Sequence, residues 1–291
     1  MASLKEIRSR INSVTSTKKI TSAMKMVSAA KLHKAEEQTR QFLPYKDKLT
    51  SVLGQYLGAQ EGEIKIPLAT RREVRKALIV TIASNSGLCG TYNSSVFKLF
   101  SKTVDEYRKQ GITDIEVIAI GKKMGEHANR CGFANSRQYD KMTDKLSYES
   151  AFQLARQLSD RFLAGECDEI KVVYNHFKNA GVQIPTAEVF LPLQPKADNS
   201  ANKNQLYFTE PDPATFIAEL VPMVVRIRMY SILLDAVASE HGARTTAMQV
   251  ASDNAEKMIG EITQLYNRAR QEVITNELLD IVGGSEALRN S

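Results

Sequence analysis

The sequence has no long apolar run and few of the residues that bind metals or form disulfides. No stretch of 18 or more apolar residues occurs among its 291 residues, so we expect no membrane-spanning helix. Cys89, Cys131 and Cys167 are spaced too widely for a disulfide framework or a zinc site, and the four histidines form no ligand pattern. These absences predict a reduced, cytosolic protein without a bound metal or cofactor.

The N-terminal segment MASLKEIRSR lacks the apolar part of a secretory signal. It resembles a transit peptide in being amphipathic and containing arginine, but Glu6 and the unbroken helical pattern that follows argue against cleavage. We therefore expect the mature chain to begin here. A composition of 43% hydrophobic and 25% charged residues predicts a folded protein, long enough for two domains or one domain with a long extension.

Positive charge is concentrated in the first fifth of the chain. Residues 1–57 contain 11 Lys and Arg against four Asp and Glu, a net +7, whereas the whole chain carries +6. Such a segment attracts an acidic partner, which could be a nucleic acid, an anionic membrane or an acidic protein surface. A solvated helix face explains the same charge, so charge alone does not identify the partner.

Proline and glycine are nearly absent from residues 4–57, where only Pro44 and Gly54 occur. A helix of this length would extend about 80 Å at ~1.5 Å per residue, which is too long for a globular core. We expect a kink or a break at Pro44, because proline removes a backbone hydrogen bond. The predicted apolar stripe begins with the heptad spacing of a coiled coil and continues less strictly, through Leu4, Ile7, Ile11, Val14, Ile20, Met24, Val27, Leu32, Ala35, Phe42, Leu49, Leu53 and Tyr56.

Short strands and helices alternate in the middle of the chain. Residues 77–83, 114–121, 169–177 and 184–192 have strand patterns, and residues 93–111, 122–132 and 148–163 have helical patterns. This alternation predicts a parallel α/β sheet that ends in a hairpin at the turn KNAG.

A second long helix is predicted from Pro213 to Val282, after a polar loop and with Asp212 as its N-terminal cap. Pro222, Gly242 and Gly260 alone interrupt it. Its predicted apolar stripe passes through Leu234, Val237, His241, Met248, Ala251, Ala255, Met258, Ile262, Leu265, Ala269 and Val273.

The two long helices are each other's most available partner, because neither can leave its stripe in water or fold stably alone. If both attach to the same side of the middle domain, their directions are opposite. The predicted fold is therefore a long antiparallel two-helix coiled coil formed by the N- and C-terminal helices, with a Rossmann-like α/β domain at its base. The predicted boundaries are 1–57 for the first helix, 75–192 for the α/β domain, 193–212 for a loop and 213–291 for the last helix.

The last helix is predicted to be longer than the first by 16 residues, about 24 Å, or by roughly 9 Å if Pro222 ends a separate helix. Leu278, Leu279, Ile281 and Val282 then lie without cover from this chain, which predicts an apolar socket in another protein. The adjoining segment from Tyr266 crowds polar side chains around a thin apolar stripe. It is either a solvated face or a contact surface.

One loop, IASNSGLCGTYN, has the position of a phosphate loop or a nucleophile elbow, directly between a strand and a helix. It contains only Gly87 and Gly90, so it matches neither the dinucleotide fingerprint nor the P-loop. Cys89 has no histidine near it in sequence to serve as a base. We expect a tight structural turn rather than a catalytic site.

Several segments together resemble the gamma subunit of F-type ATP synthase. They are IRSRINSVTSTKKITSAMKMVSAAKL, SNSGLCGTYN, EPDP, ASEHGARTTAM, ASDNA and LYNRARQEVITNELLDIVGG, and they span the chain in the family's order. Gly242 stands where alanine is common in that family.

The resemblance implies a non-catalytic rotor subunit of a proton-translocating ATP synthase. Its helix pair would stand inside a hexamer of alpha and beta subunits, with the α/β domain near the epsilon subunit and the membrane c-ring. It would be a peripheral protein at the cytoplasmic face of the inner (plasma) membrane, without insertion or nucleic-acid binding. The positions that match partner contacts in the family are Met24, Lys25, Arg270, Gln271 and Glu277. Together with Thr275, Leu278 and Ile281 of the last helix, they are the partner contacts that we expect.

Two other functions stay open at this point. A basic coiled-coil protein that binds nucleic acid would use the +7 segment and would show steep salt dependence. An α/β enzyme would use the Gly87 to Gly90 loop and would lose turnover on Cys89→Ser.

Overall fold

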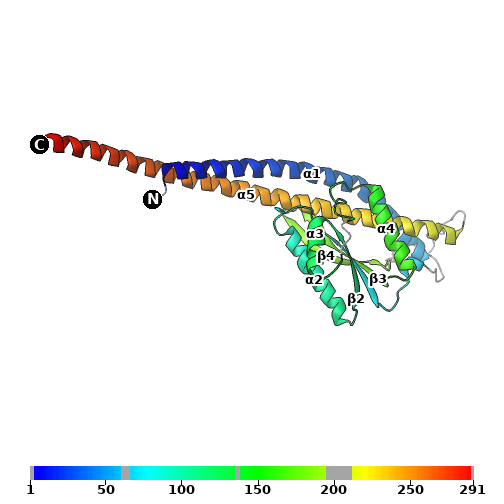
Figure 1. Cartoon of the computed structure of the whole chain (residues 1–291). Coiled ribbons are helices and arrows are strands. Elements are labelled where there is room, and N and C mark those ends of the chain that lie inside the picture. The colour runs from blue at the N-terminus through cyan, green and yellow to red at the C-terminus, as the bar shows by residue number, and fades with distance from the viewer. Residues whose placement is uncertain (1–2, 60–65, 135–137, 195–211, 290–291) are drawn as a thin grey trace. The chain divides into compact units, whose positions relative to one another are not determined.

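The computed structural model describes residues 3–59, 66–134, 138–194 and 212–289 (Figure 1). The chain divides into two compact units, which we describe separately: residues 28–244, and residues 1–27 together with 245–291. The elements are α1 (Leu4–Ala59), η1 (Pro67–Ala69), β1 (Lys76–Ile82), α2 (Tyr92–Lys109), β2 (Asp114–Ile120), α3 (Lys122–Arg130), α4 (Tyr148–Leu163), β3 (Glu169–Asn179), β4 (Val182–Leu191) and α5 (Pro213–Arg289).

The unit of residues 28–244 is built on a four-stranded sheet in the order β2-β1-β3-β4. Strand β1 pairs in parallel with β2 and with β3, while β4 returns antiparallel beside β3. The central strand β1 is buried at every position after Lys76, as expected for a strand covered on both faces. These pairings confirm the predicted parallel sheet and its final hairpin.

Each predicted strand and helix of this sheet lies within two residues of the observed element. The match is closest for α4, where Ser147 accepts a hydrogen bond from the Ser150 amide and completes a capping box. Gly121, which follows β2, has φ 92°, and a Cβ there would lie 2.1 Å from the Ala83 carbonyl oxygen. Glycine therefore allows the end of β2 to pass close to the chain that follows β1.

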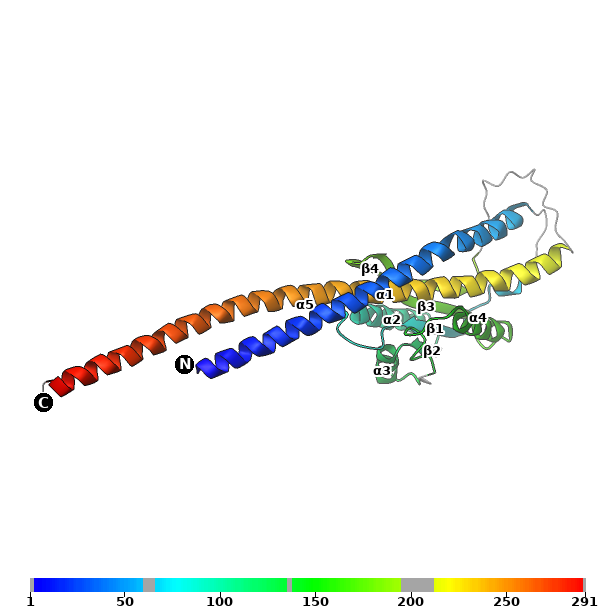
Figure 2. The same cartoon turned by 90° about the horizontal axis from the view of Figure 1, so that it is seen from above.

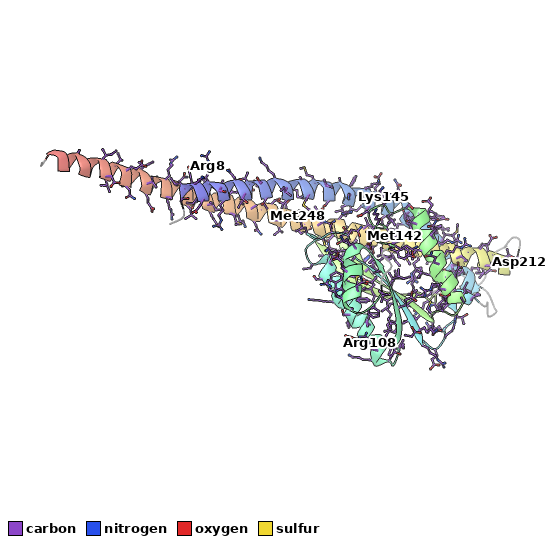
Figure 3. The ribbon with its side chains drawn as sticks, viewed as in Figure 1. Arg8, Arg108, Met142, Lys145, Asp212 and Met248 are labelled. Carbon is purple, nitrogen blue, oxygen red and sulfur yellow. The ribbon has the colours of Figure 1, made fainter. Side chains whose placement is uncertain are left out.

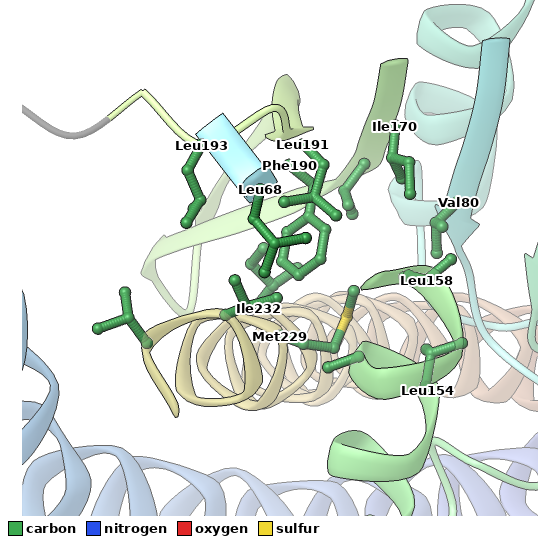
Figure 4. Close-up of a cluster of buried hydrophobic side chains, with 14 of the residues drawn as sticks. Leu68, Val80, Leu154, Leu158, Ile170, Phe190, Leu191, Leu193, Met229 and Ile232 are labelled. Carbon is green, nitrogen blue, oxygen red and sulfur yellow. The ribbon is translucent and has the colours of Figure 1, made fainter. Parts of the chain in front are cut away.

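The two faces of the sheet have different covers. Helices α2 and α3 pack on one face through a cluster that includes Ile79, Phe100 and Met124. The other face packs against α4, η1 and the first part of α5 (Figure 4). In that cluster Met229 and Ile232 of α5 lie with the α4 and β4 side chains, so α5 is a core element of this unit.

Both long helices continue through their prolines. Helix α1 is helical on both sides of Pro44, and α5 passes Pro222 in the same way. A break at Pro44, one of the two outcomes expected from the sequence, is therefore wrong. Burial explains the continuity, because Phe42 packs edge-on against Tyr230 at 4.9 Å and Leu53 is buried, which offsets the lost backbone bond.

Asp212 caps α5, as the sequence predicts. Its carboxylate accepts the Thr215 amide at 3.0 Å and the Thr215 hydroxyl at 2.6 Å. Figure 3 shows Asp212 at the start of this helix. Most of the predicted loop before it, residues 195–211, lies outside the described residues.

In the second unit, the N-terminal part of α1 runs antiparallel to the C-terminal part of α5. Lys18 pairs with Glu256 at 2.9 Å, while Lys25, seven residues later, bonds Gln249, seven residues earlier on α5, at 2.8 Å. Figures 1 and 2 both show these two segments side by side. Throughout the described ranges, no helix combines the length and the apolar character needed to cross a membrane.

Gly242 lies on α5 where the β3–β4 hairpin approaches it most closely. An added Cβ would lie 3.0 Å from Cε2 of Phe177 and 3.2 Å from Cα of Ala180. At Gly260 of the same helix, nothing lies within 4 Å of such a Cβ.

We predict that Gly260→Ala stabilises the protein by about 0.5–1 kcal/mol through helix propensity. Gly242→Ala should fall short of that gain by about 1–2 kcal/mol, because it crowds the hairpin backbone. Urea unfolding of the two variants measures the difference. Equal stabilisation by both would contradict the close packing of the hairpin on α5.

Candidate functional site

The eight predicted contact residues all lie in the unit formed by residues 1–27 and 245–291. Met24 and Lys25 lie on α1, and the other six lie on α5. Met24 and Lys25 are partly exposed, whereas all six α5 residues are exposed. Of these residues, the structure brings only Lys25 into a hydrogen bond across the helix pair, to Gln249.

The burial pattern along α1 repeats in strict steps of three and four. Every position in these steps is buried or partly exposed: Leu4, Ile7, Ile11, Val14, Lys18, Thr21, Lys25, Ser28, Leu32, Ala35, Thr39, Phe42, Lys46, Leu49, Leu53 and Tyr56. On α5 the matching series is Thr245, Met248, Ser252, Ala255, Ile259, Ile262, Tyr266 and Ala269. We call these two series the seam; they have the a/d spacing of a coiled coil.

Part of the predicted apolar stripe is wrong, because large apolar side chains were favoured over strict spacing. Ile20 and Val27 are 60% and 58% exposed, and Thr21 and Ser28 take the seam positions beside them. On α5, Met258 and Leu265 are likewise exposed, and Ile259 and Tyr266 replace them. The polar seam residues were missed, although counting the heptad onward from Leu4 reaches every one of them.

Polar side chains meet across the seam in three successive layers. Lys18 pairs with Glu256, the Thr21 and Ser252 hydroxyls lie 2.7 Å apart, and Lys25 bonds Gln249. The Lys18 pair is exposed and contributes little to stability. The Thr21 hydroxyl also donates to the Lys18 carbonyl, so the Ser252 hydroxyl is the donor between the two. Polar seam positions of this kind specify the register of a helix pair at some expense of stability.

The last part of α5 has no α1 residue opposite it. Extending the register of the polar layers places Leu4 opposite residues 269–270, and side chains 270–285 are all exposed. Figures 1 and 2 show α5 continuing past the start of α1. Leu278 and Ile281 are 57% and 68% exposed, and Val273, Ile274, Leu279 and Val282 are also open to solvent. This confirms the predicted apolar segment without cover in this chain, which we call the α5 end (residues 270–285).

The α5 end mixes these apolar residues with charge. Arg270 is followed by Glu272, Glu277 and Asp280, and Thr275 donates its hydroxyl to the Gln271 carbonyl. An exposed apolar surface bordered by charges is typical of a protein-binding segment.

The β1–α2 loop (residues 83–91) is the alternative candidate site. The Cys89 thiol is buried, with Ser84, Ser86 and Asn93 as its polar neighbours at 3.3–3.9 Å. None of these neighbours is a base. Within the described residues Cys89 therefore lacks the partner that a nucleophile requires.

Helix α5 contacts this loop through a buried ion pair. Arg244 donates to the Glu240 carboxylate at 2.7 Å and to the Ser86 side chain at 3.1 Å. Burial raises the pKa of Glu240, and the adjacent Arg244 opposes that rise. Burial also lowers the pKa of His241 to about 4, with the positive charges of Arg244 and Lys31 acting in the same direction and Asp144 opposing them.

Comparison with known proteins identifies the class. A family model described as ATP synthase matches residues 3–288. Among curated relatives, the ATP synthase gamma chain of Bacteroides fragilis is 46% identical over 291 residues, covering 99% of this chain and 100% of the relative. The gamma chains of Phocaeicola vulgatus and Flavobacterium johnsoniae are 43% and 45% identical, each covering 99% of this chain and 100% and 99% of the relatives.

Solved structures show the same fold at lower identity. The Euglena gracilis mitochondrial ATP synthase (OSCP/F1/c-ring) contains a chain with a TM-score of 0.64 and 20% identity, covering 98% of this chain and 94% of that one. A chain of the Tetrahymena thermophila ATP synthase central stalk/c-ring has a TM-score of 0.55 and 22% identity, covering 80% and 99%. The chain described here belongs to the ATP synthase gamma chain family. The nucleic-acid hypothesis gains no support from these comparisons.

We predict an energetic coupling between Thr21 and Ser252. In a double-mutant cycle with Thr21→Val and Ser252→Ala, the interaction should be about 0.5–1.5 kcal/mol by urea unfolding. Thr263→Val is the matched control, because its hydroxyl bonds only the Ile259 carbonyl of its own helix. The changes in unfolding free energy caused by Thr263→Val and Ser252→Ala should simply add. If the changes caused by Thr21→Val and Ser252→Ala also add, the polar layer is disproved.

We also predict that His241 makes the fold sensitive to acid. Its pKa is lower in the folded protein than the ordinary 6.5, so the unfolded chain takes up the proton first as the pH falls. Stability is therefore lost between pH 6.5 and about 4, by about 1 kcal/mol at pH 5 after allowance for partial exposure. Relative to the parent, His241→Gln should flatten the curve of unfolding free energy against pH. Glu240 is retained in both proteins, so an unchanged slope would exclude His241.

Proposed function

We propose that this chain is the central-stalk rotor subunit of an F-type ATP synthase. In this role it couples ion-driven rotation of the membrane ring to conformational changes in the catalytic beta subunits, and it catalyses no reaction itself. Membership of the gamma chain family carries the proposal. The α5 end supports it independently, because six exposed apolar side chains need a partner that this chain does not supply.

In this proposal the helix pair is an antiparallel coiled coil, and the α/β unit is a Rossmann-like domain. The heptad seam and the polar layers support the first assignment. Three parallel strands with helices on both faces support the second.

We assign the alpha and beta subunits as the partners of the helix pair. The α5 end would occupy an apolar socket in their hexamer, with Arg270, Gln271, Thr275 and Glu277 in polar contacts around Leu278 and Ile281. Met24 and Lys25 would face an acidic segment of a beta subunit. Lys25 has an ammonium with three donors, so it can bond Gln249 and still attract a carboxylate within the ~8 Å range of unscreened charge.

The exposed face of α1 suits a surface that moves against its housing. Met26 and Val27 are exposed on this face. The small side chains of Ala23, Ala29 and Ala30 are exposed close to them in the sequence. Small and flexible side chains offer close approach without deep pockets that would fix one orientation. Charge-mediated contacts also vary gradually with distance, which tolerates sliding.

The α/β unit would bind the epsilon subunit and the c-ring, at the cytoplasmic face of the inner membrane as a peripheral protein. The similar solved structures are a central stalk/c-ring assembly and an OSCP/F1/c-ring assembly of ATP synthases. The coupling function then requires both units of the chain to engage different partners.

We predict that alpha and beta subunits mixed with this chain form a 3:3:1 complex with steady ATP hydrolysis.

In the complete, membrane-bound enzyme, Arg270→Ala with Gln271→Ala should lower proton pumping per ATP hydrolysed about threefold or more, the scale of losing two polar contacts. Removal of residues 276–291 should weaken assembly or torque more than ATP hydrolysis.

The control is Lys102→Ala with Glu106→Ala, an exposed pair on α2 in the other unit of the chain. It should leave pumping per ATP unchanged. Full coupling in the Arg270 and Gln271 variant would remove those two residues from the proposed contact, and failure to form a 3:3:1 complex would refute the rotor assignment.

A further inference from the structure

The β1–α2 loop lies at the point in the sheet where an α/β protein commonly binds a ligand. The chain leaves β1 for β2 on one side and later returns to β3 on the other side, so the carboxyl end of β1 is the switch point of the topology. Here Ala243 and Arg244 of α5 contact the loop at this end of the strand, and Ala236 contacts Tyr92 at the start of α2. Helix α5 of the same chain therefore occupies the position where a ligand would commonly bind.

The loop is bonded to α2 and α3. The Ser84 amide donates to Oδ1 of Asn93 in α2 at 3.1 Å, and Asn85 accepts the Lys122 amide at the start of α3 at 2.8 Å. The first residue of α2, Tyr92, accepts a hydrogen bond from Asn175 of β3 at its carbonyl, at 2.9 Å. A force applied to this loop is thus transmitted directly to α2 and α3, and through Tyr92 to β3.

Helix α5 is attached to the loop and to Tyr92, the first residue of α2, by contacts of two kinds. Tyr92 donates its buried hydroxyl to the Ala236 carbonyl at 3.1 Å, and Cys89 and Tyr92 form a small buried cluster with Ala243. Arg244 adds a fork: one terminal nitrogen bonds Glu240, and the other bonds the Ser86 hydroxyl at 3.1 Å and its carbonyl at 3.3 Å. The Arg244 and Glu240 side chains are only 8% and 9% exposed.

A buried ion pair of this kind is weak evidence for a stabilising role. Desolvation of the two charges offsets most of their attraction, and apolar side chains of similar volume often give equal or greater stability. The Arg244 Nε is also buried without a partner among the described residues, which adds to this cost. The pair therefore suggests a positional role.

The Arg244 hydrogen bonds depend on bond angles, whereas the apolar packing around them does not. Apolar contacts are non-directional, so they restrain a small turn of α5 about its axis less sharply than hydrogen bonds do. Hydrogen bonds weaken steeply when their angles change, and the planar guanidinium holds Glu240 and Ser86 in one geometry. Arg228 and Asp235 make earlier polar contacts from α5 to the hairpin, and Arg244 is the last residue of α5 in the unit of residues 28–244.

We propose that Arg244, oriented by Glu240, is a positioning residue that locks the rotation of α5 to the β1–α2 loop and so transmits torque between the α/β domain and this helix. The inference rests on the proposed rotor function and adds to it the residues through which the α/β domain turns the helix. Loss of this contact would let α5 twist against the domain while the apolar core stays intact.

The test uses the complete membrane-bound enzyme and two variants of the fork. Arg244→Lys keeps the positive charge beside Glu240 but cannot bridge to Ser86. Arg244→Met with Glu240→Leu removes both charges together, so that no buried carboxylate is left unpaired. Arg226→Lys is the matched control, because Arg226 lies on the same helix over the Phe152 ring at 5.9 Å and is not bonded to the loop in the structure.

We expect both fork variants to assemble and to hydrolyse ATP within about twofold of the parent rate. Their proton pumping per ATP hydrolysed should fall at least about threefold, while Arg226→Lys keeps the parent ratio. The apolar double variant should also keep the parent's thermal midpoint, because its core remains packed. A lowered ratio with unchanged stability is a result that a merely structural role would not produce.

Three results would overturn the inference: parent-like pumping per ATP in both fork variants, an equal loss in the Arg226 control, or loss of assembly in Arg244→Lys. The last result would make the pair structural, because Lys retains the charge. If the parent enzyme assembles and pumps but the variants behave like it, only this inference fails. If the parent chain does not support a coupled enzyme, the proposed function itself fails.

Discussion

The constraint on which the helix pair depends is a seam that keeps strict three- and four-residue steps even where it must use polar side chains. From Lys18 to Ser28, α1 places Lys, Thr and Ser toward α5 while Ile20 and Val27 remain in solvent. The seam therefore buries less apolar surface than the sequence could have provided. What it gains is register, since Thr21 can meet Ser252 only when both helices hold one alignment.

The apolar side chains kept out of the seam make an external surface available. Ile20, Met26 and Val27 on α1 are exposed, as are Leu278 and Ile281 at the α5 end. In a protein that functioned alone, such surface would favour aggregation. In a subunit enclosed by a hexamer it would be covered by partners, which is how the proposed function accounts for it.

Helix α5 changes its environment along its length. Between residues 217 and 236 it is buried in the core of the α/β unit, around residue 255 it is half-buried in the helix pair, and beyond residue 269 it is exposed. Its sequence follows these changes, from Val225, Met229 and Leu233 to the mixed polar α5 end. One continuous hydrogen-bonded helix thus joins the domain core to the segment that we propose binds the hexamer. In our proposal, polar contacts such as that of Arg244 add a directional restraint to this apolar packing.

Local sequence pattern is enough to predict several features: the parallel strands and their hairpin, the Asp212 cap, the exposed α5 end and the resemblance to the gamma chain family. Local pattern also gave two wrong predictions. Ile20 and Val27 were assigned to the apolar stripe because they are large and apolar, and a helix break at Pro44 was allowed because proline removes a backbone hydrogen bond. Which polar residues are buried, and which groups they contact, depends on the packing of elements that are distant in the sequence. Arg244 and Ser86 are 158 residues apart, and Tyr92 and Ala236 are 144 apart. No periodicity links such residues, since their contact exists only after the sheet, the loop and α5 have packed together.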